Sequence, residues 1–324
     1  MGDVSILPTL SPIPVKAAEN TPASNTLKCL SLTKGSESTL VGQSLPQLFA
    51  HVYGGQLISQ ALMAAAAAVD DERQDYPHSV HANFLRAGST DEEIVYTPSA
   101  LTNGRSFAAR LVQAHQGHRR LLELTASFQR PQSGVTHGLA TPLVKKPEAF
   151  ESSLDFFASQ KGPLAEFLAE TSAFDLRHVD GRVYTHPAAE RSGPHRVWLR
   201  PRCEVPSNPQ IVHRALLAYV LDQLLMEPLL KRQGLCWTTP GLALASLDYS
   251  IWFHHNIDIN DWYLFVGDSP VASGSRGLIQ ASIFDSSFRL VATIAQEAMI
   301  RLPQEGEDAG RWAFDGRGLK TANK

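Results

Sequence analysis

The sequence predicts an α+β fold built from two similar halves, each with one helix followed by several antiparallel strands. In the first half, one helix-like segment precedes three strand-like ones, at residues 54–63 and then 78–84, 105–112 and 122–128. The second half repeats this order, with a helix-like segment at residues 214–222 and strand-like ones at 246–253, 276–281 and 291–296. Two copies of one pattern predict a pseudo-symmetric pair of domains.

Changes in composition divide the chain into five stretches. They are a flexible arm, a first domain, a linker, a second domain with the candidate catalytic residues and a polar tail, at residues 1–26, 27–130, 131–172, 173–303 and 304–324.

In the first domain, residues 27–32 and 38–42 are predicted to form two short strands. Residues 47–69 carry a strong helical pattern that includes a run of alanines, which combine high helix propensity with small side chains. We expect this helix to be buried and wrapped by a sheet. Strand-like stretches fill residues 78–130, and Asn103-Gly104 indicates a hairpin turn there.

The linker is rich in Pro and Gly, and a short helix is expected at residues 152–158. Strands at residues 174–179 and 196–200 open the second domain. A helix at residues 210–231 and strands within residues 242–301 complete it.

Charge and cysteine content exclude several classes of protein. The formal net charge of −3 gives no general attraction to nucleic acid or to an anionic membrane. The three cysteines are odd in number and form no CxxC pair, so neither a disulfide framework nor a zinc cluster is expected. The histidine pairs His78-x-x-His81 and His254-His255 lack acidic or Cys partners at metal-site spacing, so we expect no metal.

The sequence also predicts a cytoplasmic location. The first residues lack the basic start and sustained apolar run of a signal peptide. No stretch approaches the roughly 20 apolar residues that span a bilayer, and the last residues are not the peroxisomal signal Ser-Lys-Leu.

Asp222 is the first candidate site residue. It stands on a largely apolar face of the second predicted helix, with Ala218 and Leu225 as helical neighbours. A carboxylate is costly to bury there unless it has partners or faces a cavity. A structural role, bonded to a backbone N–H or to Arg214, and a functional role both fit this position.

Gln296 and Ser246 are the other two candidates. Gln296 interrupts an apolar pattern of period two in residues 290–300, and a buried amide must be hydrogen-bonded, for structure or for function. Ser246 is expected to share a strand face with Asp248 and Ser250. Serine on such a face is usually structural, so its candidacy depends on its place in the repeat.

The two copies differ at these positions. When the helices are matched, Gln60 takes the place of Asp222, and when the last strands are matched, Ser127 takes about the place of Gln296. An acid, an amide and a hydroxyl therefore occur together only in the second copy. Such a trio can orient one water and accept its proton. The Gly-x-Ser-x-Gly elbow of serine hydrolases is absent, since the nearest stretch, residues 104–108, ends in Ala.

With these motifs the sequence resembles the acyl-CoA thioesterase II family, the TesB-like thioesterases with two hotdog domains. The matching stretches are residues 51–56, 78–86 and 125–129 in the first copy and 248–254 and 291–297 in the second. The resemblance covers roughly residues 27–302. It implies a double hotdog fold, with two antiparallel sheets each wrapped around a long central helix.

The resemblance also implies hydrolysis of fatty acyl-CoA to a free fatty acid and CoA, without a cofactor. In that family an Asp, a Thr or Ser and a Gln activate water, and these positions fall on Asp222, Ser246 and Gln296. Hotdog sheets commonly associate, so a homo-oligomer is expected. The Gly54-Gly55 helix start is one type of site for the oxyanion. Two alternatives stay open: a non-catalytic protein that binds acyl thioesters, and a hotdog dehydratase of enoyl- or hydroxyacyl-thioesters.

Overall fold

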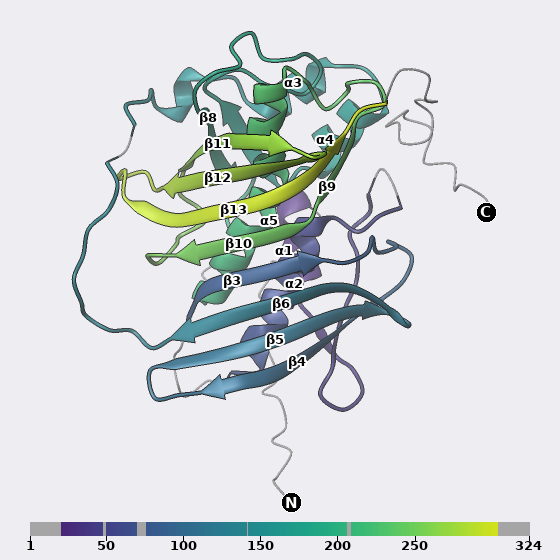
Figure 1. The fold of residues 1–324 in the computed structure, drawn as a ribbon, viewed down its shortest axis with the longest axis vertical. Helices are drawn as coiled ribbons and strands as arrows, with labels where there is room; N and C mark the ends of the chain where they lie inside the picture. The colour runs from purple at the N-terminus through teal and green to yellow at the C-terminus, as the bar shows by residue number, and fades with distance from the viewer. Residues whose placement is uncertain (1–20, 48–49, 70–75, 141, 206–208, 304–324) are drawn as a thin grey trace, which may run out of the picture.

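A single antiparallel sheet of thirteen strands runs through both halves of the described chain (Figure 1). The computed structural model describes residues 21–47, 50–69, 76–140, 142–205 and 209–303. The strands of the first half are β1 Thr33–Lys34, β2 Leu40–Gly42, β3 Tyr76–Phe84, β4 Ile94–Asn103, β5 Phe107–Gln116 and β6 Arg119–Gln129. Those of the second half are β7 Phe174–His178, β8 His195–Pro201, β9 Ala243–Ser246, β10 Asp248–Phe253, β11 Tyr263–Ser273, β12 Arg276–Phe284 and β13 Leu290–Arg301.

The two halves join edge to edge in the middle of the sheet. The strand order is β1-β2-β4-β5-β6-β3-β10-β13-β12-β11-β8-β7, with β9 paired to β13. Strands β3 and β10 pair antiparallel, from Asn83 opposite Asp248 to Ser79 opposite Trp252. The expectation of two sheets is therefore refined to one continuous sheet, because this pairing satisfies the N–H and C=O groups that two separate edges would expose.

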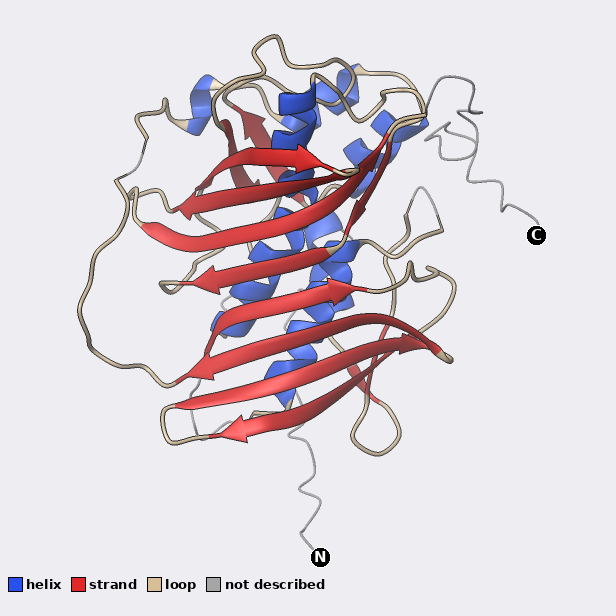
Figure 2. Ribbon diagram, viewed as in Figure 1, coloured by secondary structure: helices blue, strands red, loops and turns tan. Residues whose placement is uncertain are grey.

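Two long helices lie side by side against one face of this sheet (Figure 2). They are α2 Gly54–Ala67 and α5 Gln210–Gln233. Their faces toward the sheet and toward each other are buried, as the predicted wrapped helices require. Ser59 Oγ donates to the Ala215 carbonyl at 2.8 Å, and the Tyr53 hydroxyl donates to the Tyr219 carbonyl at 2.6 Å. These contacts fix where the start of α2 meets the middle of α5.

The segment before the first strands differs from its prediction. Residues 27–32, expected as a strand, belong mostly to the helix α1 Pro22–Leu30, which also takes the end of the expected arm. Thr21 caps this helix, its side chain accepting from the Ser24 N–H while the Ser24 side chain accepts from the Thr21 N–H. The capping box and the Pro at the first turn are helix-start signals that outweigh the short apolar alternation. The rest of the predicted arm, residues 1–20, and the predicted tail, 304–324, lie outside the described residues.

The other predicted elements are confirmed with shifted ends. The helix expected at 47–69 begins only at Gly54, and the short helix in the linker is α3 Ser153–Ser159, preceded by a 3-10 turn, Pro147–Ala149. A further linker helix, α4 Pro163–Thr171, was not predicted. No helix in the described ranges is long and apolar enough to cross a membrane.

Candidate functional site

Asp222 lies in the middle of α5 with only 5% of its surface exposed. Burial raises the pKa of its carboxyl from 3.8 to about 6, and hydrogen bonds from the Ser246 hydroxyl and the Gly55 backbone N–H partly offset that rise. A group that titrates near 6 is ionised at neutral pH and is still basic enough to accept a proton. The buried acid predicted from the helical face is therefore confirmed in its position.

Ser246, the last residue of β9, points at this carboxylate because of a β-bulge. Ser246 pairs with Ala298, whereas Ser250 pairs with Ala295, so one strand advances four residues while the other advances three. The extra residue is Leu247. The hydroxyl of Ser246 donates to Asp222 Oδ1 at 3.1 Å.

The bulge corrects one sequence expectation. Ser246 does not share a face with Asp248 and Ser250. It lies instead on the helix-facing side with Tyr249, whose hydroxyl donates to the Ala218 carbonyl of α5. A strict period of two fails at a bulge because the extra residue reverses the alternation.

Gln296 lies on β13 with no exposed surface, on the apolar face that the period-two pattern predicted. Its Nε2 donates to Ser246 Oγ at 3.1 Å. Its Oε1 is buried without a hydrogen-bond partner among the described residues. A buried acceptor left in this way needs an explanation, and a catalytic role is one of those that physical chemistry offers.

The three predicted residues therefore form one directed chain of hydrogen bonds. The amide of Gln296 donates to Ser246, and Ser246 donates to Asp222. Three elements, α5, β9 and β13, supply one group each. The hydroxyl orients the carboxylate and is in turn held by the amide, which leaves Oε1 of the amide and the second carboxylate oxygen to other partners.

The start of α2 closes the other side of Asp222. A Cβ built on Gly54 would lie 2.8 Å from Asp222 Oδ2 and 3.2 Å from the ring of Phe84. At Gly55 a Cβ would collide with the carbonyl oxygen of Tyr219, so glycine is what lets α2 approach α5. The positive end of the α2 dipole therefore lies beside the carboxylate. The two glycines at a helix start were the sequence signal for this contact, whereas nothing in the sequence placed Phe84 here.

The first copy holds its matching glutamine differently. Gln60 Oε1 accepts from the Tyr96 hydroxyl at 2.7 Å, and its Nε2 donates to the carbonyls of Cys29 and Gln43 at 2.7 and 3.0 Å. Ser127, which was matched with Gln296, does not lie on the corresponding face of its strand. Its hydroxyl contacts His78 at 2.8 Å, and its neighbours Ala126 and Phe128 are the buried residues, so the match is off by one residue. The first copy thus places apolar side chains where the second places its amide.

Two of the histidines that were not expected to bind metal contact hydroxyls on neighbouring strands. His81 Nδ1 contacts Ser250 Oγ at 3.0 Å, and His254 Nε2 contacts Thr293 Oγ1 at 2.9 Å. Arg276 forms an exposed ion pair with Glu297 at 3.0 Å.

A second buried polar cluster was not predicted. His178, His195 and Glu227 come from β7, β8 and α5, and both imidazole Nε2 atoms lie 2.7 Å from Glu227 Oε2. The three groups are the one His/Cys/Asp/Glu cluster with metal-ligand spacing in the described ranges. The imidazoles hold the pKa of Glu227 at about 2, against the rise that burial alone would cause. Direct hydrogen-bond distances mean that an ion would have to push these atoms apart, so the arrangement fits a carboxylate shared by two imidazoles.

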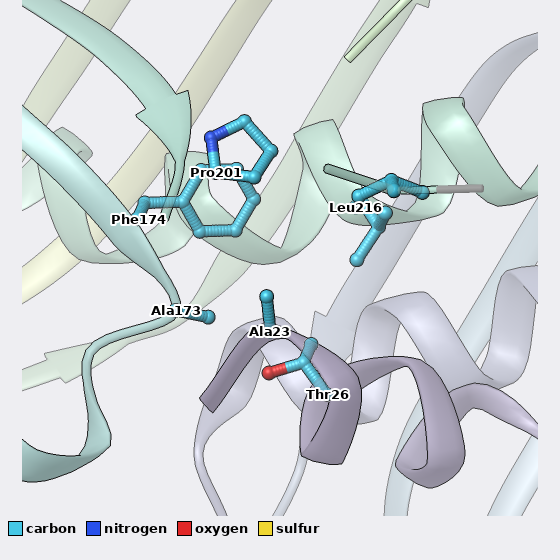
Figure 3. A pocket seen from close by; sticks show the side chains of 7 residues that line it. Ala23, Thr26, Ala173, Phe174, Pro201 and Leu216 are labelled. Carbon is cyan, nitrogen blue, oxygen red and sulfur yellow. The ribbon is translucent and has the colours of Figure 1, made fainter. Parts of the chain in front are cut away.

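A small apolar hollow lies where α1 meets the second half (Figure 3). Its empty volume is about 180 Å³, and its lining residues are Ala23, Thr26, Ala173, Phe174, Pro201, Val205 and Leu216. None of the three site residues lines it. We interpret it as a packing gap under α1.

Comparisons with known proteins match both halves of the chain. The family model of the acyl-CoA thioesterase N-terminal domain matches residues 45–129, and that of the acyl-CoA thioesterase C-terminal domain matches residues 148–300. The chain is 33% identical to acyl-CoA thioesterase 2 of Haemophilus influenzae, over 86% of this chain and 98% of that protein. It is 31% identical to acyl-coenzyme A thioesterase 8 of Homo sapiens, over 79% of this chain and 82% of that protein.

Solved structures agree with this match. A tesB protein of Mycobacterium avium subs paratuberculosis superposes with a TM-score of 0.71 and 29% identity, covering 86% of this chain and 99% of that one. An acyl-CoA thioesterase II, TesB2, from Mycobacterium marinum gives a TM-score of 0.69 at 29% identity, with the same coverage. The predicted double hotdog fold is thereby confirmed.

Proposed function

Because this chain belongs to the acyl-CoA thioesterase family, we propose that it hydrolyses acyl-CoA to a free acid and CoA, with Asp222 as the general base. The observation that carries the proposal is the directed chain from Gln296 through Ser246 to Asp222. Asp222 and Gln296 are buried, so the orientation of the carboxylate is fixed before substrate arrives.

The chemistry needs one water and no covalent intermediate. The water attacks the thioester carbonyl carbon while the Asp222 carboxylate takes its proton. The C–S bond then breaks, and the proton passes from Asp222 to the departing CoA sulfur. Ser246 keeps Oδ1 occupied, so Oδ2 is the oxygen that accepts the proton. Gln296 Oε1 accepts the second hydrogen of the water and sets its direction.

The start of α2 is the proposed place for the thioester carbonyl. Gly54 lies against Asp222 Oδ2 and the ring of Phe84, so a substrate carbon attacked there is next to the base. Backbone N–H groups at a helix start stabilise a developing oxyanion. Tyr53 holds this helix start to α5, since its hydroxyl donates to the Tyr219 carbonyl and accepts from the Gln223 N–H at 2.9 Å.

The two alternatives make different demands on the same residues. A dehydratase needs an imidazole paired with its acid, and the side chain bonded to Asp222 is the hydroxyl of Ser246. A non-catalytic binding protein would not need an acid whose pKa is raised to about 6 beside an oriented amide. The geometry therefore favours hydrolysis.

Hydrolysis of palmitoyl-CoA, followed by detection of the released thiol, tests the proposal. The wild-type protein should release CoA, and Asp222→Asn should be slower by roughly 10²- to 10⁴-fold. Equal rates for the two proteins would refute the mechanism. Asp258→Asn, a change in the loop between β10 and β11, is the matched control and should keep the wild-type rate.

Three further expectations belong to the same proposal. The physiological substrate is a fatty acyl-CoA, the protein is cytoplasmic and it assembles as a homo-oligomer. A series of acyl chain lengths, cell fractionation and light scattering test them in turn.

A further inference from the structure

The bulge that turns Ser246 toward the site is held by a side chain outside the catalytic trio. A bulge loses a backbone hydrogen bond of the ladder, and the unpaired group must find another partner. Here the Glu297 backbone N–H on β13 donates to Asp248 Oδ1 at 2.9 Å. On the other side of the bulge, the Leu247 N–H donates to the Glu297 carbonyl at 2.9 Å. Asp248 therefore replaces a ladder bond at the point where the strand shifts its register.

We propose that Asp248 is a positioning residue for catalysis, which sets the direction of the Ser246 hydroxyl by holding the bulge closed on Glu297. The inference rests on the proposed function of Asp222 and Ser246. Ser246 is only two residues from Asp248, and the bulged Leu247 is the residue between them. If the carboxylate bond is lost, the bulge can slip, and a one-residue slip turns the side chain of Ser246 to the other face.

The same bulge also ties the site to the first half of the chain. The Phe84 N–H donates to the Leu247 carbonyl at 3.0 Å, and the ring of Phe84 lies beside Gly54. The pairing of β3 with β10 begins at Asn83 opposite Asp248. Asp248 therefore lies next to the bulge and at the end of the β3–β10 pairing that joins the two halves of the sheet.

The test compares Asp248→Ala with Asp248→Asn, because an Asn oxygen still accepts the Glu297 N–H and an Ala cannot. Asp248→Ala should lower kcat by roughly 10- to 100-fold with a smaller change in KM, and Asp248→Asn should restore most of the rate. A second readout is the titration of the Asp222 carboxyl by carbon NMR. Since the Ser246 hydroxyl lowers the pKa of Asp222 from where burial would place it, Asp248→Ala should raise that pKa above its wild-type value of about 6.

Two further variants separate positioning from general stability. Asp285→Ala removes a carboxylate that accepts the N–H groups of Ser287 and Arg289 in the turn between β12 and β13, so it should lower the melting temperature without moving the pKa of Asp222. The double variant Asp248→Ala with Ser246→Ala should be no slower than Ser246→Ala alone, because both act through one hydroxyl.

The inference is overturned if Asp248→Ala behaves like the Asp285 control, or if its effect adds in full to that of Ser246→Ala. The titration requires no turnover. If the wild-type protein released no CoA, the proposed function would fail, and the NMR comparison would still decide whether Asp248 positions Ser246.

Discussion

Replacing Asp222 by Asn is expected to slow hydrolysis and, at alkaline pH, to make the protein more stable. The carboxyl is 5% exposed, and burial raises its pKa from 3.8 to about 6. A change of about two pKa units corresponds to about 3 kcal/mol that the ionised form costs the folded state. Asn has nearly the same shape and carries no charge, and its oxygen accepts the hydrogen bond from Ser246.

The sign of the pH dependence follows from the direction of this change. The folded state holds the proton of Asp222 more tightly than the unfolded chain does. Stability associated with Asp222 is therefore fully present below a pH of about 4 and is lost as the pH rises through about 6. The variant lacks this loss. Its free energy of unfolding, relative to wild type, should be greater at pH 8 than at pH 4 by up to about 3 kcal/mol.

Urea unfolding of both proteins at several pH values from 4 to 8, with thiol release measured on the same samples, tests this expectation. Asp180→Asn serves as a control. Although burial raises the pKa of Asp180, the hydrogen bonds and charge of Arg196 outweigh burial and lower that pKa below 3.8, so its pH dependence lies below about pH 4 and the stability difference for this variant should stay nearly constant from pH 4 to pH 8. The reasoning about Asp222 is refuted if the stability difference for Asp222→Asn is the same at pH 4 and pH 8.

Two other predictions concern the start of α2 and the second polar cluster. Gly54→Ala should abolish hydrolysis with little loss of stability, because its Cβ would lie 2.8 Å from Asp222 Oδ2. Gly55→Ala should reduce both hydrolysis and stability, because its Cβ would meet the backbone of α5. Melting curves and thiol release, measured on each variant, distinguish these two outcomes. Glu227→Ala should lower the free energy of unfolding by roughly 3–5 kcal/mol, because it leaves two buried imidazoles without their carboxylate partner. Dialysis against EDTA should leave the melting temperature of the wild-type protein unchanged, and a drop would show a bound metal instead.

The elements and residues predicted correctly from sequence are those with a strong local signal. Gln296 breaks a clean alternation, and Asp222 interrupts an apolar helical face, so each was placed on the correct side of its element. The hairpin after Asn103 and the helix after residue 210 follow from patterns of many residues. Such signals are readable in the sequence because burial of one face constrains every second residue of a strand and every third and fourth residue of a helix.

The failures occur where a single residue or a distant contact decides. Leu247 is one extra residue in a strand, and it reverses the face of Ser246 in a way that no local pattern reveals. A register error of one residue also matched Ser127 of the first copy with Gln296 of the second. The cluster around Glu227 draws its members from three elements far apart in the chain, so spacing along the sequence carried no trace of it.

The difference between the two copies lies in the partners of one helical position. Both atoms of the Gln60 amide are satisfied by groups of its own half, namely Tyr96, Cys29 and Gln43. Asp222 instead takes one bond from its own half and one from the start of α2 in the other half. A satisfied amide at zero exposure has neither the charge nor the free oxygen to accept a proton from water.

We therefore expect that Gln60→Asp alone creates no second active centre. The new carboxylate would face two carbonyl oxygens, which would favour its protonated form, and thiol release from Gln60→Asp combined with Asp222→Asn should stay at the level of Asp222→Asn alone.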